Sequence, residues 1–208
     1  MIKNIVFDMG NVLVKYDPEY FLKDYSDFEK ELFYTEIYHS DNWRKLDRGE
    51  LSEEELISLV SSHIPERYHA DAKKLIKWYE LSTEIEGMEQ LIQQLKKTGY
   101  AVYLLSNTSQ AFYEFSKNIS ILKHFNGRFI SADYGLLKPD REIFHLFCKK
   151  FSLCSSECVF IDDTPINVKS ALEEGFAGIV FTGNVPMLKN ELADLGIIPD
   201  CVMNESDE

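Results

Sequence analysis

Residues with chemically useful side chains stand at the ends of several short apolar segments of this chain. They are Asp8 after "NIVF", Ser106 in "LLSNT", Lys138 in "GLLKPD", and the pair Asp162 and Asp163 after "CVFI". A carboxylate, a hydroxyl, a lysine and an acidic pair together suit phosphoryl transfer, because the carboxylate can attack phosphorus in line while the hydroxyl and the lysine neutralise the phosphoryl oxygens. This chemistry requires segments far apart in the sequence to meet at one site.

The acidic pair predicts a divalent cation. Mg²⁺ prefers oxygen ligands and is commonly held by one or two carboxylates together with water and substrate phosphate, which Asp8 with Asp162 and Asp163 could supply. The chain of 208 residues also has a formal net charge of −13, so its surface should repel nucleic acid and anionic membranes. We therefore expect Mg²⁺ as the cofactor and a small molecule, rather than nucleic acid or a membrane, as the partner.

The apolar segments have the character of strands in a parallel sheet. The segments "KNIVF", "YAVYLL", "GRFIS", "CVFI" and "AGIVF" are nearly continuously apolar, as is typical of strands covered on both faces. Helical stretches separate them, and one of these places Met88, Leu91, Ile92 and Leu95 on a single stripe. The alternation predicts an α/β protein with a Rossmann-like, mostly parallel sheet, in which the carboxyl ends of the strands meet in one crevice.

Residues 16–85 interrupt this alternation. They contain no convincing strand but several helical patterns, one of which opens with a capping box of Ser52 and Glu55. A simple crossover between parallel strands needs only about a dozen residues. We therefore interpret the segment as an inserted α-helical cap, and we divide the chain into a core of residues 1–15 and 86–208 and a cap of residues 16–85.

The stretch "DNWRKLDRGELS" in the cap is polar and carries an aromatic residue. Because the cap follows the first strand, it should lie over the crevice where α/β sheets bind ligands. Trp43 and Arg44 are therefore candidate substrate-binding residues. An ordinary helix connection with surface charges remains an equally open interpretation of this stretch.

The sequence suggests a cytoplasmic protein. Asp8 falls within what would have to be the apolar stretch of a signal peptide, and no apolar run approaches the length of a membrane span. The cysteines include no CxxC pair, which favours reduced thiols over metal or redox sites.

The order of these motifs resembles that of the haloacid dehalogenase-like (HAD) hydrolase superfamily. Its first motif corresponds to "FDMGNVL", its second to "LLSN", its third to "LLKP" and its fourth to "IDDTPINVKSALEEG". The resemblance covers nearly all of residues 1–15 and 86–185, and the helical insertion fits the cap that the family places after its first motif. The "D-x-G-N-V" form of the first motif is similar to a bacterial branch that includes sugar-phosphate phosphatases, such as those acting on α-glucose 1-phosphate.

The resemblance implies catalytic roles for the matching residues. Asp8 would be the nucleophile that forms an aspartyl-phosphate. Ser106 and the backbone of Asn107 would hold the phosphoryl oxygens, and Lys138 would neutralise the charge between nucleophile and phosphate.

The resemblance also implies the metal ligands and the reaction. Mg²⁺ would bind the Asp8 carboxylate, the Gly10 carbonyl and Asp163, with Asp162 as a direct or water-mediated ligand. The implied function is a Mg²⁺-dependent phosphatase that hydrolyses a small phosphomonoester, a sugar phosphate in particular.

Gly10 departs from the family pattern. Most phosphatases of the superfamily have a second aspartate two residues after the nucleophile, which protonates the leaving group and later activates the attacking water. Gly10 keeps the backbone carbonyl but lacks this carboxyl group, so we expect sugar 1-phosphates and aryl esters, which have good leaving groups, to react best. A surrogate acid, either Asp17 or a residue of the cap, would remove this preference.

Other functions fit the sequence less well. A response-regulator receiver also combines an acidic pair, a phosphorylated aspartate, a hydroxyl and a lysine, but its acidic pair opens the chain, whereas here the pair comes last. A dehalogenase would leave the acidic pair without a role, and a phosphomutase depends on the acid/base group that Gly10 lacks. The main alternative is a catalytically weakened member of the fold that binds a phospho-ligand or a protein partner.

Overall fold

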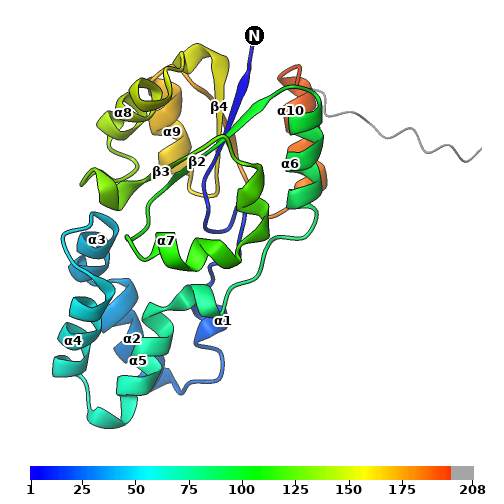
Figure 1. Ribbon diagram of the computed structural model, residues 1–208. Helices are drawn as coiled ribbons and strands as arrows, with labels where there is room; N and C mark the ends of the chain where they lie inside the picture. Colours follow the sequence, from blue (N-terminus) through cyan, green and yellow to red (C-terminus); the bar gives the residue numbers. More distant parts are fainter. Residues whose placement is uncertain (198–208) are drawn as a thin grey trace, which may run out of the picture.

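A five-stranded parallel sheet forms the centre of the molecule (Figure 1). The computed structural model describes residues 1–197, so residues 198–208 lie outside the description. The strands are β1 (Asn4–Phe7), β2 (Ala101–Ser106), β3 (Gly127–Ile130), β4 (Cys158–Asp162) and β5 (Ala177–Val180), in the spatial order β3-β2-β1-β4-β5. All neighbouring strands are parallel, and Phe7 of the central strand pairs with Leu104 of β2 and Ile161 of β4. The predicted α/β class with a Rossmann-like parallel sheet is confirmed.

Helices cover both faces of the sheet. Figure 1 shows α6 (Met88–Lys97) and α10 (Val185–Asp194) on one side and α8 (Arg141–Phe151) and α9 (Pro165–Glu173) on the other. Side chains alternate accordingly, since Phe7 belongs to the apolar cluster that includes α6 and α10, whereas Val6 belongs to the cluster that includes α8 and α9. Burial on both faces explains why the strand sequences are almost continuously apolar.

Local sequence signals set the helix ends near the carboxyl edge of the sheet. Pro165 opens α9 at a position where its missing N–H is not needed. This helix start comes only two residues after Asp163, so the acidic pair is held between a strand and a helix start.

The core is completed by α7 (Phe112–Phe115) and the 3-10 turns η4 (Ser116–Asn118), η5 (Ser120–His124), η6 (Ser131–Asp133) and η7 (Ser155–Glu157). No helix within residues 1–197 combines the length and the apolar character that crossing a membrane requires.

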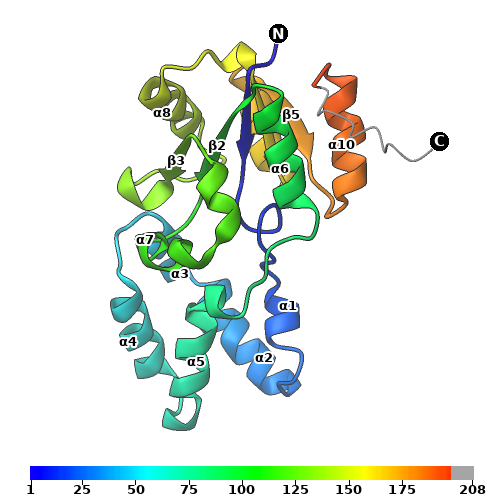
Figure 2. The same ribbon diagram turned by 45° about the vertical axis from the view of Figure 1, so that its right-hand side comes forward.

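Between β1 and α6 the chain forms a separate helical layer, which lies beyond one end of the sheet (Figure 2). It consists of α1 (Pro18–Phe21), α2 (Asp27–Phe33), the π-helical turn η1 (Tyr34–Tyr38), α3 (Asp41–Asp47), α4 (Glu53–His63) and α5 (His69–Ile76), with the 3-10 turns η2 (Glu66–Tyr68) and η3 (Trp78–Glu80). The predicted capping box is present at the start of α4, where Ser52 Oγ accepts from Glu55 N and the Glu55 carboxylate accepts from Ser52 N.

This helical layer has a hydrophobic core of its own. Phe33 of α2 and Leu56 of α4 are fully buried within it, and the cluster they belong to is distinct from the two clusters that cover the sheet. A core of residues 1–15 and 86–208 with a cap of residues 16–85 therefore remains our proposed division of the chain.

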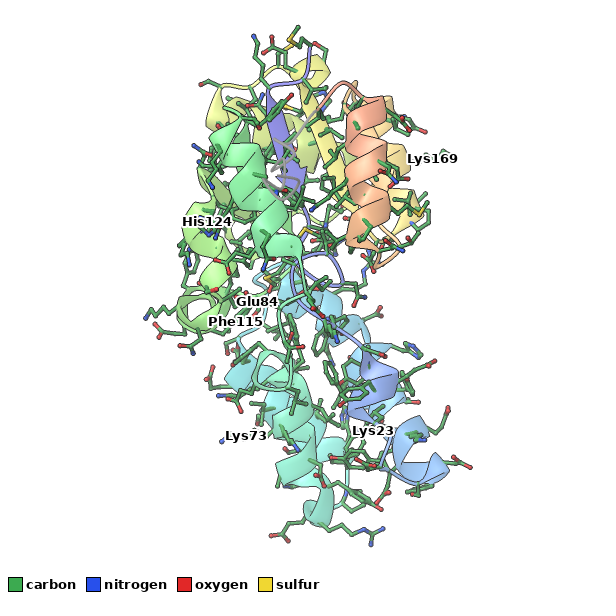
Figure 3. The ribbon with its side chains drawn as sticks, turned by 90° about the vertical axis from the view of Figure 1, so that its right-hand side faces the viewer. Lys23, Lys73, Glu84, Phe115, His124 and Lys169 are labelled. Carbon is green, nitrogen blue, oxygen red and sulfur yellow. The ribbon has the colours of Figure 1, made fainter. Side chains whose placement is uncertain are left out.

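Two adjacent segments join the cap to the core. Val14 pairs with Glu84 in an antiparallel bridge, and Lys15 N donates a 2.8 Å hydrogen bond to Thr83 O. Figure 3 shows Glu84 at this junction between the two layers. Because the first of these segments follows directly on β1, the cap lies over the carboxyl edge of the sheet.

Candidate active site

Lys138 connects two carboxylates at the carboxyl edge of the sheet. Its Nζ lies 2.7 Å from Oδ1 of Asp8, which follows β1, and 2.6 Å from Oδ2 of Asp162, the last residue of β4. All three residues are buried. Because β1 and β4 are parallel neighbours, their carboxyl ends bring Asp8 and Asp162 together, and the loop that follows β3 supplies the lysine.

The backbone of Lys138 is held by the side chain of Asn107. Nδ2 of Asn107 donates to the carbonyl oxygen of Lys138 at 3.0 Å, and Oδ1 of Asn107 accepts from the N–H of Lys138 at 2.9 Å. Burial by itself would lower the pKa of Lys138, but the carboxylates of Asp8 and Asp162 outweigh it, and the pKa is raised above its ordinary value. The ammonium group is therefore both charged and fixed in place.

Asp8 is buried, and it lines a cavity at this edge of the sheet. This burial raises the pKa of Asp8 to about 7, an effect that Lys138 reduces and Asp162 reinforces. Its ionised form, which is the nucleophilic one, therefore depends on positive charge placed nearby.

The two members of the acidic pair have different surroundings. Asp162 is fully buried, and its oxygens are occupied by Lys138 Nζ and by Nδ2 of Asn167, which lies 3.1 Å from both of them. Asp163 lines the cavity, and Nδ2 of Asn11 donates to its Oδ2 at 3.0 Å. Asp163 thus retains acceptor capacity toward the cavity, whereas Asp162 mainly holds Lys138.

The carboxylates form a cluster that fits a hard cation. Oxygen atoms of Asp8, Asp162 and Asp163 lie within 4.8 Å of one another. One ammonium group, that of Lys138, does not balance these carboxylates, and a phosphate group placed beside them would add further negative charge. A divalent cation with oxygen ligands would remove this excess, and Mg²⁺ has that preference.

A cavity of about 300 Å³ lies over these groups and is lined from both sides. The core contributes Asp8, Gly10, Ser106, Asn107, Lys138 and Asp163, and the cap contributes Tyr16, Trp43, Asp47 and Trp78. Ser106 ends β2, and the backbone N–H of Asn107 has no backbone or side-chain acceptor within residues 1–197. A hydroxyl and an N–H are therefore available to phosphoryl oxygens beside Lys138.

A larger hollow of about 730 Å³ lies on another side of the cap junction. Glu84 and Phe115, labelled in Figure 3, are among its lining residues. It is lined by neither a lysine nor the acidic pair, so the chemistry of the lining, rather than cavity size, identifies the candidate site.

The cap places Trp43 and Arg44 differently from what the sequence suggested. Trp43 lines the cavity, whereas Arg44 is exposed and lies outside its lining. Successive residues of an α-helix are rotated by about 100°, so the residue that shares the face of Trp43 is Asp47, four positions later. Asp47 is therefore the charged residue that α3 brings to the cavity. Its i, i+4 spacing from Trp43 is the signal that could have found it.

Two residues close to the first motif have separate roles. Asp17, considered as a surrogate acid, is exposed and caps α1 by accepting from Tyr20 N at 3.1 Å. Tyr16 lies beside Gly10 in the cavity, and its ring is 4.9 Å from that of Trp78, measured between centroids. Aromatic surface from the cap thus adjoins the position where the family's second aspartate is missing.

Comparison with known proteins identifies the family to which this fold and this arrangement of residues belong. The family model for haloacid dehalogenase-like hydrolases matches residues 2–175. The chain belongs to the haloacid dehalogenase-like hydrolase family, as the order of its motifs predicted.

Relatives with assigned activities include phosphatases. D-ribitol-5-phosphate phosphatase of Bacteroides thetaiotaomicron is 30% identical over 190 residues, which cover 85% of this chain and 90% of that protein. Flavin mononucleotide hydrolase 1 of Arabidopsis thaliana is 27% identical over 198 residues, covering 93% of this chain and 77% of that protein. The crystal structure of a HAD family enzyme from Bacteroides thetaiotaomicron, in complex with magnesium and inorganic phosphate, has a TM-score of 0.69 and 25% identity and covers 88% of this chain and 96% of that one. The protein is thus a phosphatase-type hydrolase.

Proposed function

We propose that this protein is a Mg²⁺-dependent phosphatase that hydrolyses a small phosphomonoester, a sugar or sugar-alcohol phosphate, through an aspartyl-phosphate on Asp8. The observation that carries the proposal is the 2.7 Å contact between Asp8 Oδ1 and Lys138 Nζ in a cavity that also presents Ser106 and Asp163. We expect the enzyme to act in the cytoplasm on a free small molecule, and not on nucleic acid or at a membrane.

The residues of the chain account for the steps at phosphorus. A carboxylate oxygen of Asp8 forms a bond to phosphorus while the bond to the leaving oxygen breaks, and water then attacks phosphorus and restores the carboxylate. Lys138 lies beside the attacking oxygen, and Ser106 Oγ with the N–H of Asn107 would bind the phosphoryl oxygens as their charge changes. Lys138 can offset negative charge on the phosphoryl group without rearrangement, because Asp162 holds its ammonium group and Asn107 holds its backbone.

Asp8, Asp163 and the Gly10 carbonyl would hold Mg²⁺, with Asp162 behind them. When bound, the ion supplies positive charge that favours the ionised form of Asp8 and offsets the repulsion between the carboxylates and phosphate. The magnesium and phosphate complex of the Bacteroides thetaiotaomicron enzyme supports this assignment.

The cap side of the cavity supports a small, hydroxylated substrate. A volume of about 300 Å³ is at the lower end of the range typical of ligand sites. Trp43 and Tyr16 offer flat, amphipathic surfaces, and Asp47 adds a polar group to the cap side of the lining. A sugar or sugar-alcohol phosphate matches this lining, and the relative that acts on D-ribitol 5-phosphate supports the choice.

Phosphate release from a substrate panel tests the proposal. Sugar phosphates, sugar-alcohol phosphates and flavin mononucleotide are compared with and without Mg²⁺, for the wild type and for Asp8→Asn. We expect Mg²⁺-dependent release from a small hydroxylated substrate, and a loss of at least about 10⁴-fold in the variant, which keeps the shape of the nucleophile but not its charge. Asp8→Asn turning over at the parental rate would exclude Asp8 as the nucleophile. Binding of sugar phosphates without release under any metal condition would instead identify a phospho-ligand binding protein.

A further inference from the structure

Asp47 brings a carboxyl group into the cavity from the cap. It is the last residue of α3, it is half-buried, and it lines the same cavity as Asp8 and Lys138. No hydrogen bond or ion pair within residues 1–197 occupies its side chain. The carboxyl group is therefore available to a ligand, unlike the carboxyl group of Asp162.

The backbone of Asp47 is fixed relative to the phosphate-binding side of the core. Its carbonyl oxygen accepts a 2.6 Å hydrogen bond from Ser131 Oγ, and the same hydroxyl accepts a 2.9 Å hydrogen bond from the N–H of Thr108, two residues after Ser106. Gly49 lies so close to Ala132 that a Cβ atom there would be 2.3 Å from the Ala132 carbonyl oxygen. Views of the molecule in Figures 1 and 2 show α3 at the end of the cap nearest the core.

The reaction lacks a proton donor at the position next to the nucleophile. Gly10 has no side chain, Asp17 caps α1 away from the cavity, and Asp163 belongs to the candidate metal cluster. Tyr16 lines the cavity, but burial raises the pKa of its hydroxyl well above the ordinary value. The hydroxyl therefore stays protonated near neutral pH and cannot act as the base that activates water. Asp47 is the remaining carboxyl group in the lining of this cavity within residues 1–197.

We propose that Asp47 is the general acid and base of the reaction, supplied by the cap in place of the side chain that Gly10 lacks. This inference rests on the proposed phosphatase function. Protonated Asp47 donates its proton to the leaving oxygen as the bond from that oxygen to phosphorus breaks, so the product leaves as a neutral alcohol. The resulting carboxylate takes a proton from the water that attacks the aspartyl-phosphate, which regenerates protonated Asp47, ionised Asp8 and inorganic phosphate.

The surroundings of Asp47 suit this exchange. Burial raises the pKa of Asp47 to about 7, Asp8 adds to the increase, and Lys138 opposes it. A group that holds its proton near neutrality can serve in turn as acid and as base. Because the group comes from the cap, proton transfer depends on the cap lying against the core, and the hydrogen bond from Ser131 Oγ to the Asp47 carbonyl is one contact between them.

Leaving-group dependence tests the role of Asp47. In Asp47→Asn, the loss in kcat/KM should be about 10²–10⁴-fold for sugar and alkyl phosphates, whose leaving oxygens need a proton, and much smaller for an aryl phosphate such as p-nitrophenyl phosphate. Equal losses for all leaving groups, or a change confined to KM for hydroxylated substrates, would show a binding role and overturn the inference. Asp8→Asn, measured alongside, should lose activity toward every substrate. If it does not, the proposed function fails, independently of Asp47.

Moving the acid to position 10 provides a second test. A Cβ atom on Gly10 would meet only Tyr16 Cβ and Cγ within 4 Å, at 3.6 and 4.0 Å, which are ordinary contacts, so the backbone at this position has room for a side chain. We expect Gly10→Asp to restore alkyl phosphate hydrolysis at least about 10-fold in the Asp47→Asn background, while Gly10→Asn, the matched control, does not.

Gly10→Asp in the otherwise wild-type chain keeps the proposal testable if Asp47→Asn folds poorly. With Asp47 present, Gly10→Asp should change alkyl and aryl phosphate hydrolysis to a similar, small extent. A selective gain of about 10²-fold or more for alkyl phosphates in Gly10→Asp alone would mean that the wild type has no proton donor, and it would overturn the assignment of Asp47.

Discussion

Ser131 Oγ donates a 2.6 Å hydrogen bond to the carbonyl oxygen of Asp47. Ser131 is fully buried in η6, directly after β3, and Asp47 ends α3 of the cap. One hydroxyl group thus joins the loop that follows a core strand to the cap helix that lines the cavity. The geometry of the site therefore depends on how the cap and the core fit together, and not on the strand ends alone.

Gly49→Ala should disturb this fit. Gly49 has a φ of 71° and lies against the Ala132 carbonyl, whereas Gly99 has a φ of 93° and has open space, with nothing within 4 Å, where a Cβ atom would stand. Alanine at either position suffers the strain of left-handed backbone, roughly 1–2 kcal/mol. Only alanine at position 49 also displaces the cap, so we expect kcat/KM to fall in Gly49→Ala and to stay near the wild-type value in Gly99→Ala. Similar kinetics in the two variants would argue against a catalytic requirement for this contact.

Asp163→Ala and Asp162→Ala should have different effects. Asp163 retains acceptor capacity toward the cavity, so its removal should raise the Mg²⁺ concentration needed for half-maximal activity by at least about 10-fold. Asp162 is fully buried against Lys138, and removing one partner of a buried ion pair typically costs about 3–5 kcal/mol. Magnesium titrations and denaturant unfolding in EDTA measure the two effects. An unchanged magnesium requirement in Asp163→Ala would remove Asp163 from the metal site.

Trp43→Ala and Arg44→Ala form a matched pair of neighbouring cap variants. Trp43 lines the cavity and Arg44 is exposed outside it. We expect Trp43→Ala to raise KM or to change the ranking of substrates, because it removes aromatic surface from the cavity lining, whereas Arg44→Ala should retain wild-type kinetics. A strong and selective effect of Arg44→Ala would show that the cap moves Arg44 into the cavity when substrate binds.

Asp47→Asn should change the pH dependence of stability in the metal-free protein. The pKa of Asp47 rises from an ordinary value of 3.8 to about 7 in the folded state. The folded state therefore holds the proton of Asp47 more tightly than the unfolded state does. The stability that this gives is fully present below about pH 4 and is lost as the pH rises to about 7. Asparagine resembles the protonated form and does not titrate, so the melting temperature of the variant relative to the wild type should increase between about pH 4 and pH 8. Thermal melts in EDTA across this range measure the difference. A difference in melting temperature that does not change with pH would show that folding does not raise the pKa of Asp47.

Local sequence patterns were sufficient to predict the strands of the sheet and the residues at its carboxyl edge. Continuous apolar runs identify strands that are buried on both faces, and each run ends in the residue it delivers to the carboxyl edge, such as Asp8 after β1 and Ser106 at the end of β2. Parallel strands have one common direction, so these ends must converge whatever lies between them. For the same reason the order of residues along the chain is enough to place the acidic pair near Asp8.

The cap residues could not be assigned in this way, because their positions depend on packing between layers. The sequence suggested Arg44, but the rotation of α3 against the core brings Trp43 and Asp47 to the cavity and leaves Arg44 in solvent. That rotation is set by contacts such as the one between Ser131 and Asp47, which join segments with no local relationship in the sequence. Asp8, Ser106 and the acidic pair follow from the sequence as a group, because strand direction brings the ends of β1, β2 and β4 together, and the loop after β3 adds Lys138. That α3 turns Trp43 toward the cavity, and with it Asp47 one helical turn later, follows only from the folded molecule, because the docking of one helical layer onto another is a property of the whole fold.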